Sequence, residues 1–170
     1  MRNLSSTLSR NDRLQRKHIW CALLIAPLLF VSSHTASAAP VADQLNLDNY
    51  KGKVVYIDFW ASWCGPCKLS FPFMEQMLSA FHRTDFVIIT VNMDHSRARA
   101  DAFLYQQPTS NLPVIYDSTG AIAKRFGVKA MPTSIIVDKS GAVRFKHEGF
   151  FENQISAYEA HIWELLSETH

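Results

Sequence analysis

The sequence predicts an α/β fold, in which helices flank a mixed central sheet, and three observations support this prediction. Short apolar, β-branched runs predict buried strands. Apolar residues at helical spacing follow the first two of these runs, and such alternation implies parallel strands. Two later runs are separated by a tight polar turn, which adds an antiparallel hairpin. A chain of 170 residues with 48% hydrophobic residues fits one domain of this class.

The first 38 residues have the layout of an export leader. A basic stretch ends at Lys17, an apolar run of 13 residues spans Ile19–Val31, and small residues lead to Ala38. This layout predicts a signal peptide over residues 1–38 and a folded domain over residues 39–170. The apolar run is shorter than the roughly 20 residues of a membrane span, so we expect a periplasmic or other extracytoplasmic domain that is soluble after cleavage. The alternative is an uncleaved leader that anchors the domain to the inner membrane through residues 19–31.

The net charge of +2 comes from this leader. Residues 1–38 hold five basic residues and one acidic residue, so the remaining chain carries 12 basic and 14 acidic side chains. No basic block is left in the predicted domain. We therefore expect neither nucleic acid nor an anionic membrane surface among the partners.

The first half of the domain contains two predicted strands, each followed by a helix. Residues 40–53 are expected to be an irregular lead-in, and the strands cover Val54–Trp60 and Phe86–Val91. Pro72 is expected to kink the first helix near its start. The buried side of that helix is predicted to comprise Phe73, Met74, Met77, Leu78 and Phe81. The second helix ends before Pro108, and its apolar side comprises Ala98, Ala102 and Phe103.

The second half begins with a short apolar segment, Leu112–Tyr116, and a turn over residues 117–120. A short helix then ends at Gly127. Thr133–Val137 and Val143–His147 are predicted to be the two strands of the hairpin. A last helix is predicted to bury Ile155, Tyr158, Ile162 and Leu165.

Cys64, Gly65, Pro66 and Cys67 form the turn between the first strand and its helix. Proline is tolerated in the first turn of a helix, so this turn presents two thiols at a helix N-terminus. Unpaired N–H groups and the helix dipole favour a thiolate at Cys64, the exposed end, whereas Cys67 lies one turn further in and is shielded. This arrangement is suited to thiol–disulfide exchange, in which Cys64 attacks a disulfide and Cys67 resolves the mixed disulfide.

Two other roles for this cysteine pair are less favoured. A structural disulfide of an exported protein is expected to close a longer loop. A zinc site needs more ligands, but the chain has no second cysteine pair, and its histidines, among them His82, His95, His147 and His161, are scattered without ligand spacing. We therefore predict no metal and no cofactor, and we assign no chemistry to Cys21 in the leader.

The motif around the turn resembles the thioredoxin superfamily. It reads Asp58-Phe59-Trp60-Ala61-Ser62-Trp63-Cys64-Gly65-Pro66-Cys67-Lys68, followed by Pro72 and later by Met131-Pro132-Thr133. Residues 91–143, with an extra helix and strand before the Pro-Thr pair, are more similar to the exported TlpA/ResA-type reductases than to cytosolic thioredoxin. The resemblance covers roughly residues 41–166 and implies a thioredoxin-like fold with a helix–strand insertion before a cis-proline loop.

The resemblance also implies roles for single residues. Cys64 matches the nucleophile, Cys67 the resolving thiol, and the two together the redox disulfide. A substrate-binding surface is implied around them, made of Trp63, Gly65, Pro66, Met131 and Pro132. In it Pro132 is the cis-proline that faces the cysteines, and the Met131 backbone pairs with a client peptide like an added strand. An ordinary strand-entry proline is the alternative for Pro132, and Trp60 is expected to be core.

Asp58 is a carboxylate in an otherwise apolar strand. Burying a lone charge is unfavourable, so we expect a raised pKa for Asp58. The resemblance implies that Asp58 is the general base for Cys67, and a carboxylate hydrogen-bonded through water is the structural alternative. Two positions depart from the family: Thr90 replaces a lysine of thioredoxin, and Ser70 replaces an acidic residue of many ResA-type proteins.

The sequence thus predicts an exported enzyme, a monomeric thiol–disulfide oxidoreductase that reduces disulfides in other exported proteins. Apocytochrome c, and hence cytochrome c biogenesis, or a copper-site protein would be candidate clients, and a membrane electron donor would re-reduce the enzyme. The same chemistry run as an oxidant or isomerase is one alternative. A non-catalytic module that binds peptide or copper through the same thiols is another.

Overall fold

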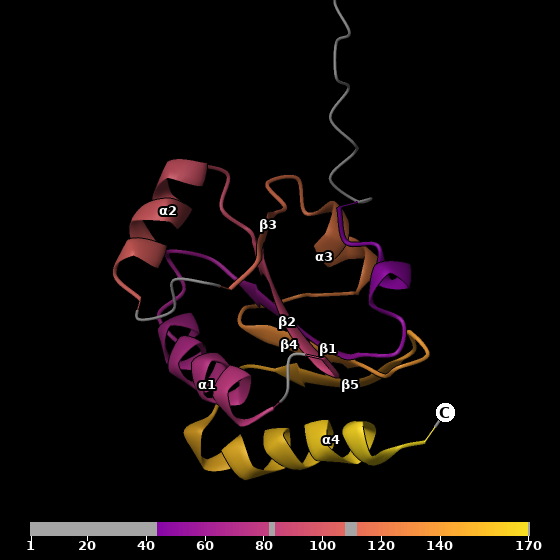
Figure 1. Ribbon diagram of the computed structural model, residues 1–170. Helices are drawn as coiled ribbons and strands as arrows, with labels where there is room; N and C mark the ends of the chain where they lie inside the picture. The colour runs from indigo at the N-terminus through magenta and orange to yellow at the C-terminus, as the bar shows by residue number, and fades with distance from the viewer. Residues whose placement is uncertain (1–43, 82–83, 108–111, 170) are drawn as a thin grey trace, which may run out of the picture. The chain divides into compact units, whose positions relative to one another are not determined.

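The computed structural model describes residues 44–81, 84–107 and 112–169, all of which belong to one structural unit. The predicted leader, residues 1–38, lies outside the described residues. Within them, a central sheet is covered by helices on both sides (Figure 1). The predicted α/β fold with a mixed sheet is confirmed.

Five strands form the sheet in the order β3-β2-β1-β4-β5. The central strand β1, Val54–Trp60, pairs in parallel with β2, Phe86–Asn92, and antiparallel with β4, Thr133–Val137. The edge strands are β3, Val114–Tyr116, parallel to β2, and β5, Val143–Glu148, antiparallel to β4. Every residue of β1 is buried, because helices cover both faces of the sheet at its centre.

The described part of the chain places four α-helices around this sheet: α1 Cys67–Ala80, α2 Arg97–Tyr105, α3 Ala121–Arg125 and α4 Ile155–Ser167. Along the chain, α2, β3 and α3 come after β2 and before β4. The predicted insertion therefore precedes the Pro132 loop in the sequence. Two short 3-10 helices, η2 Leu47–Tyr50 and η3 Glu152–Gln154, complete the described elements. The prediction of an irregular lead-in was therefore wrong at η2, where the Asn46 side chain accepts a hydrogen bond from the Asp48 N–H at 3.0 Å.

Alternate residues of β1 face two separate apolar clusters, as the period of two in a strand requires. One cluster lies under α1 and α4, and there the Trp60 ring packs against Phe71 at 5.2 Å and Phe103 at 4.9 Å between ring centres. The other cluster lies toward α3 and joins the odd-numbered residues of β1 to Ile122 and Ala123. The site described below stands above the first cluster.

The helix faces agree with the prediction in α1 and α4, although Leu78 and Ile155 are only half-buried, and they differ from it in α2. Phe73, Met74, Met77 and Phe81 are buried along α1, as are Tyr158, Ile162 and Leu165 along α4. In α2, however, the buried residues are Ala100 and Phe103, whereas Ala98 and Ala102 are exposed. Alanine marks a buried face poorly because its side chain gains little free energy on burial. None of the helices in the described part of the chain is long and apolar enough to cross a membrane.

Candidate active site

Cys64 and Cys67 lie where β1 ends and α1 begins, and their sulfur atoms form a disulfide with the Cα atoms 5.4 Å apart. Pro66 stands immediately before the helix with a φ of −62°, which its ring enforces, so the proline pre-shapes the helix start. The Cys64 N–H closes the turn by donating to the Ala61 carbonyl at 3.0 Å. Cys67 is completely buried and Cys64 is 5% exposed, so solvent reaches the predicted nucleophile before its partner.

The predicted substrate-binding residues lie in two places, the turn itself and the cis-proline loop. Trp63 is 67% exposed, and Gly65 and Pro66 are exposed beside it. Met131 is half-buried and packs against the cluster that contains both cysteines, and its bond to Pro132 is cis. Trp60 is fully buried, as expected. The binding roles of these residues remain predictions.

The end of β5 borders the cis-proline loop. The Gly149 N–H donates to the Pro132 carbonyl at 2.8 Å. Gly149 has a φ of +88°, and an added Cβ there would lie 2.8 Å from the Phe151 ring, so a larger residue would be strained. The residue that follows β5 thus holds the loop at Pro132, where the chain enters β4.

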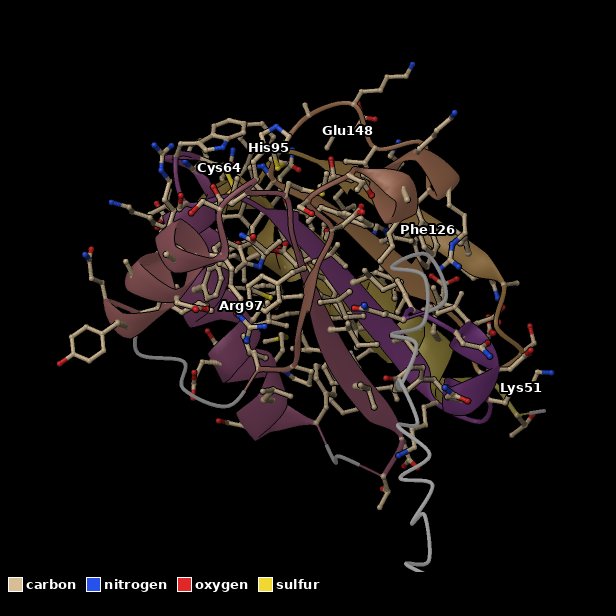
Figure 2. The ribbon with its side chains drawn as sticks, turned by 90° about the horizontal axis from the view of Figure 1, so that it is seen from above. Lys51, Cys64, His95, Arg97, Phe126 and Glu148 are labelled. Atoms are coloured by element: carbon tan, nitrogen blue, oxygen red, sulfur yellow. A yellow bond between two sulfur atoms is a disulfide. The ribbon has the colours of Figure 1, made fainter. Side chains whose placement is uncertain are left out.

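A second loop residue, Asp94, fixes the segment before Cys64. Asp94 Oδ2 accepts hydrogen bonds from the Ser62 N–H and from the Asn92 side chain, both at 2.8 Å, and Oδ1 accepts from the Ser62 hydroxyl at 2.8 Å. This role of Asp94 could not be predicted, because Asp94 follows a strand and is 32 positions from Ser62 in the sequence. Figure 2 shows the next residue, His95, near Cys64 at the same end of the molecule.

Asp58 lies beneath the turn, and burial raises its pKa to about 8, with a smaller opposing effect from Ser70. The Ser70 hydroxyl donates to the Cys67 carbonyl at 2.9 Å and makes a longer contact of 3.5 Å with Asp58 Oδ2. Ser70 therefore touches both residues of the proposed proton transfer. The expected rise in pKa is confirmed.

Neither of the two positions that depart from the family pattern, Thr90 and Ser70, supplies a positive charge to Asp58. Thr90 is the register partner of Asp58 in β2, but its hydroxyl donates to the Pro113 carbonyl at 3.0 Å. Burial and Ser70 are the causes of the shifted pKa, and no positive charge contributes. The raised pKa of Asp58 lies close to that of an ordinary thiol, about 8.5, so Asp58 and Cys67 are matched for proton exchange.

The prediction that the histidines are scattered was wrong for two of them. His147 in β5 and His161 in α4 stack with ring centres 5.1 Å apart, and their nitrogens share a hydrogen bond of 2.9 Å. Ser134 in β4 bonds to the other ring nitrogen of His147 at 3.2 Å. Within the described ranges, no group of three or more His, Cys, Asp or Glu side chains could hold a metal ion.

Comparisons with known proteins agree with this geometry. A family model, Redoxin, matches residues 33–162. The chain belongs to the Redoxin family. The predicted resemblance to TlpA/ResA-type proteins of the thioredoxin superfamily is confirmed by relatives of that name.

Two curated relatives are the thiol-disulfide oxidoreductases ResA of Bacillus thuringiensis subsp. konkukian and Bacillus subtilis. They are 33% and 30% identical to this chain over 100 residues, which is 59% of this chain and 57% and 55% of theirs. The Redoxin chain thus spans little more than half the length of these relatives.

Two solved structures share the fold. One is named as a thiol:disulfide interchange protein, DsbE, of Chlorobium tepidum, and it is 41% identical with a TM-score of 0.68 over 71% of this chain and 85% of its own. The other is the exposed lipoprotein thioredoxin Etrx1 of Streptococcus pneumoniae, which is 34% identical with a TM-score of 0.61 over 70% of this chain and 90% of its own.

Proposed function

We propose that this Redoxin-family chain is a thiol–disulfide oxidoreductase that acts through Cys64 and Cys67. One observation carries the proposal: the two cysteines form a disulfide at the start of α1, and the outer one, Cys64, is slightly exposed. The inner one, Cys67, is buried and is linked through Ser70 to Asp58, a carboxyl of raised pKa. Such an arrangement favours attack by the outer thiol and resolution by the inner one. The names of the ResA and DsbE relatives support the same chemistry.

The reaction has two steps. The Cys64 thiolate attacks one sulfur of a client disulfide, which forms a mixed disulfide and releases the other client sulfur as a thiolate. Cys67 then loses its proton to the carboxylate form of Asp58 and attacks the Cys64 sulfur, which restores the Cys64–Cys67 disulfide and releases the second client thiolate. Two electrons pass from the enzyme to the client. Trp63 and the Met131 backbone would hold the client chain beside Cys64.

We place this reaction outside the cytoplasm, in the reducing direction, on disulfides of other exported proteins such as apocytochrome c or a copper-site protein. The leader-like residues 1–38 support export, and the Gly-Pro pair between the cysteines supports reduction by resemblance. A monomer re-reduced by a membrane electron donor fits this scheme. The reduction potential tests the direction: about −270 mV would support a reductant and about −120 mV an oxidant.

The chemistry itself is tested with variants of the full chain. Reduced protein is mixed with oxidised glutathione, and the products are separated by mass. The Cys67→Ser variant is expected to accumulate a mixed disulfide on Cys64, and the Cys64→Ser variant is expected to lose exchange. The Ser79→Ala variant, an exposed change further along α1, is the control. Full activity of Cys64→Ser would contradict the proposal and favour a module that only binds peptide or copper.

A further inference from the structure

Polar side chains cross one face of the sheet, from buried Asp58 to two half-buried histidines. Asp58 in β1 is the register partner of Ser134 in β4, and Ser134 is the register partner of His147 in β5. Register partners on neighbouring strands point to the same face, with Cβ atoms about 5 Å apart. These three side chains therefore form a row beneath α1 and α4, with Asp58 at its inner end.

Hydrogen bonds join the outer end of the row. One nitrogen of His147, Nδ1, bonds to the Ser134 hydroxyl at 3.2 Å, and the other, Nε2, bonds to Nδ1 of His161 at 2.9 Å. Both ring nitrogens of His147 are thus engaged. His161 comes from α4 and is partly exposed, so the row ends at solvent.

Tyr56 lies near Asp58, at the inner end of the row. It precedes Asp58 by two positions in β1, so its side chain lies on the same face, and it is fully buried. Burial raises the pKa of the Tyr56 phenol most, the charge of Asp58 raises it further, and the Ser134 side chain lowers it, so both groups lie near the phenol. The hydroxyl groups of Tyr56 and Ser134 thus share one face of the sheet with the carboxyl of Asp58 and the ring of His147.

A route of this kind is needed because Asp58 is 1% exposed. A carboxyl that takes a proton from Cys67 in each cycle must release it before the next, and the disulfide turn and α1 cover it on the side of Cys67. We propose that Tyr56, Ser134, His147 and His161 carry protons between Asp58 and solvent during the resolving step, which rests on the proposed function. They act as proton-transferring residues and do not touch the client.

The proton balance is simple. Asp58 first releases its own proton along the row. The Cys67 thiol then gives its proton to the Asp58 carboxylate, the new Cys64–Cys67 bond forms, and the bond from Cys64 to the client breaks with the client leaving as a thiolate. Each hydroxyl of the row then accepts one proton and passes on its own. His147 receives a proton on one ring nitrogen and releases one from the other to His161, which gives one to water. Re-reduction of the disulfide by a dithiol runs the same route inward.

Few other titratable groups face the route. Asp58 is faced by Tyr56 on its own strand, by Thr90 and Ser134 from the neighbouring strands, and by Cys67 and Ser70 from α1. His147 is faced by Ser134 and, from α4, by Tyr158 and His161. Lys146 and Glu148 alternate with His147 and pair with each other at 3.0 Å on the other face. Burial, and then His161, hold the pKa of His147 at about 4, so His147 passes a proton on and does not store it.

The test measures the resolving step alone. Full-length reduced protein is mixed with oxidised glutathione in a stopped-flow instrument, and the decay of the mixed disulfide is followed from pH 5 to 9 by tryptophan fluorescence and acid quench. Ser134→Ala and His161→Gln are expected to slow this decay by about tenfold or more, as loss of a proton-transfer group does. Added imidazole is expected to restore the rate of His161→Gln. Lys146→Gln, next to His147 on the other face, is the control and is expected to decay at the wild-type rate.

The reduction potential separates a proton route from a structural network, because a route changes a rate without changing an equilibrium. The proposal expects unchanged potentials and unchanged melting temperatures in Ser134→Ala and His161→Gln. Wild-type decay rates in both variants would overturn it. Slower decay with a proportionate shift of potential or melting temperature would also overturn it, in favour of packing. If wild-type protein forms no mixed disulfide on Cys64, the proposed function itself fails, and that result is visible before any variant is compared.

Discussion

The two faces of β1 are built from alternate residues of one strand, yet their chemistry differs. The face toward α3 is apolar throughout, with Val55, Ile57 and Phe59 packed in the second cluster. The face toward α1 carries Tyr56 and Asp58 among apolar neighbours, and the disulfide lies above it. Because a buried carboxyl costs free energy, the first face serves stability, whereas the second gives up stability for a group that can exchange protons.

The period of two in β1 therefore places residues that stabilise the core on one face and residues that exchange protons on the other. Neighbouring side chains such as Ile57 and Asp58 point to opposite sides of the sheet, so a change on one side leaves the other side in place. Substitutions at adjacent positions should therefore have effects of opposite sign on stability and unequal effects on redox chemistry. Substitutions on each face, and in the contacts beside them, test that separation.

The largest effect is expected on the apolar face. Ile57→Ala should lower the free energy of unfolding by about 3 to 4 kcal/mol, because it leaves a cavity in a fully buried site. Urea unfolding of the oxidised protein measures this loss, and Ile57→Val, with an expected loss of about 1 kcal/mol, is the matched control. The reduction potential should not move. A shift of more than about 30 mV would show that the two faces are coupled.

On the opposite face, Asp58→Asn should stabilise the oxidised protein. The folded-state pKa of Asp58 is about 8, above the ordinary value of 3.8, so the unfolded state binds fewer protons between these values and stability falls as pH rises. Removing the carboxyl should therefore add about 2 to 4 kcal/mol at pH 8 and close to nothing below pH 4. Urea unfolding at both pH values measures the gain. An equal gain at both would exclude ionisation as its cause.

Asp94→Asn should loosen the segment that leads to Cys64. An amide in place of the carboxylate has one acceptor oxygen, so at least one hydrogen bond from Ser62 or Asn92 is lost. We expect a loss of about 1 to 3 kcal/mol in the free energy of unfolding, and faster alkylation of Cys64 in the reduced protein. Ser62→Ala removes one of these bonds and should have a smaller effect. An unchanged alkylation rate in Asp94→Asn would show that the turn is held elsewhere.

The smallest effect is expected for His147. The pKa of His147 is lowered from 6.5 to about 4, so the unfolded state binds more protons in this range and stability falls as pH falls through it. Because His147 is only half-buried, solvent screening reduces the expected loss to about 1 kcal/mol. The difference between the wild-type and His147→Gln unfolding curves at pH 7 and pH 4.5 isolates this term, since Asp58 contributes equally to both. Parallel curves would contradict the prediction.

The turn at Cys64 and the central strand could be predicted because their signals are local. Pro66 has a fixed φ and no N–H, which places it at a helix start, and an unbroken apolar run marks a strand buried on both faces. The raised pKa of Asp58 followed from the same pattern, since a carboxyl within a fully buried strand has no water to solvate its charge. In α2, by contrast, alanines at helical spacing gave the wrong buried face, because their small side chains do not decide how a helix packs.

The histidine pair could not be predicted, because the pairing of the hairpin shifts by one residue. Val137 pairs with Val143, but beyond the shift Ile136 pairs with Phe145. Counting back from the turn without a shift would place Lys146 opposite Ser134, and a slip of one residue moves every side chain to the other face. The irregularity brings His147 opposite Ser134 instead, and α4 then supplies His161.

The sequence predicted the order of α1 to α4 and of β1, β2, β4 and β5, whereas β3 was predicted only as an apolar segment. It also predicted the two cysteines at a helix start and the burial of Asp58. Each of these depends on residues close together in the chain, whose periodicity and backbone preferences act locally. Three sets of contacts became visible only in the tertiary structure. They are the hydrogen bond from Ser62 to Asp94, the contacts of Ser70 with Cys67 and Asp58, and the bonds that join Ser134, His147 and His161. Those contacts depend on strand register and helix packing, which are set by the whole core and not by any one segment.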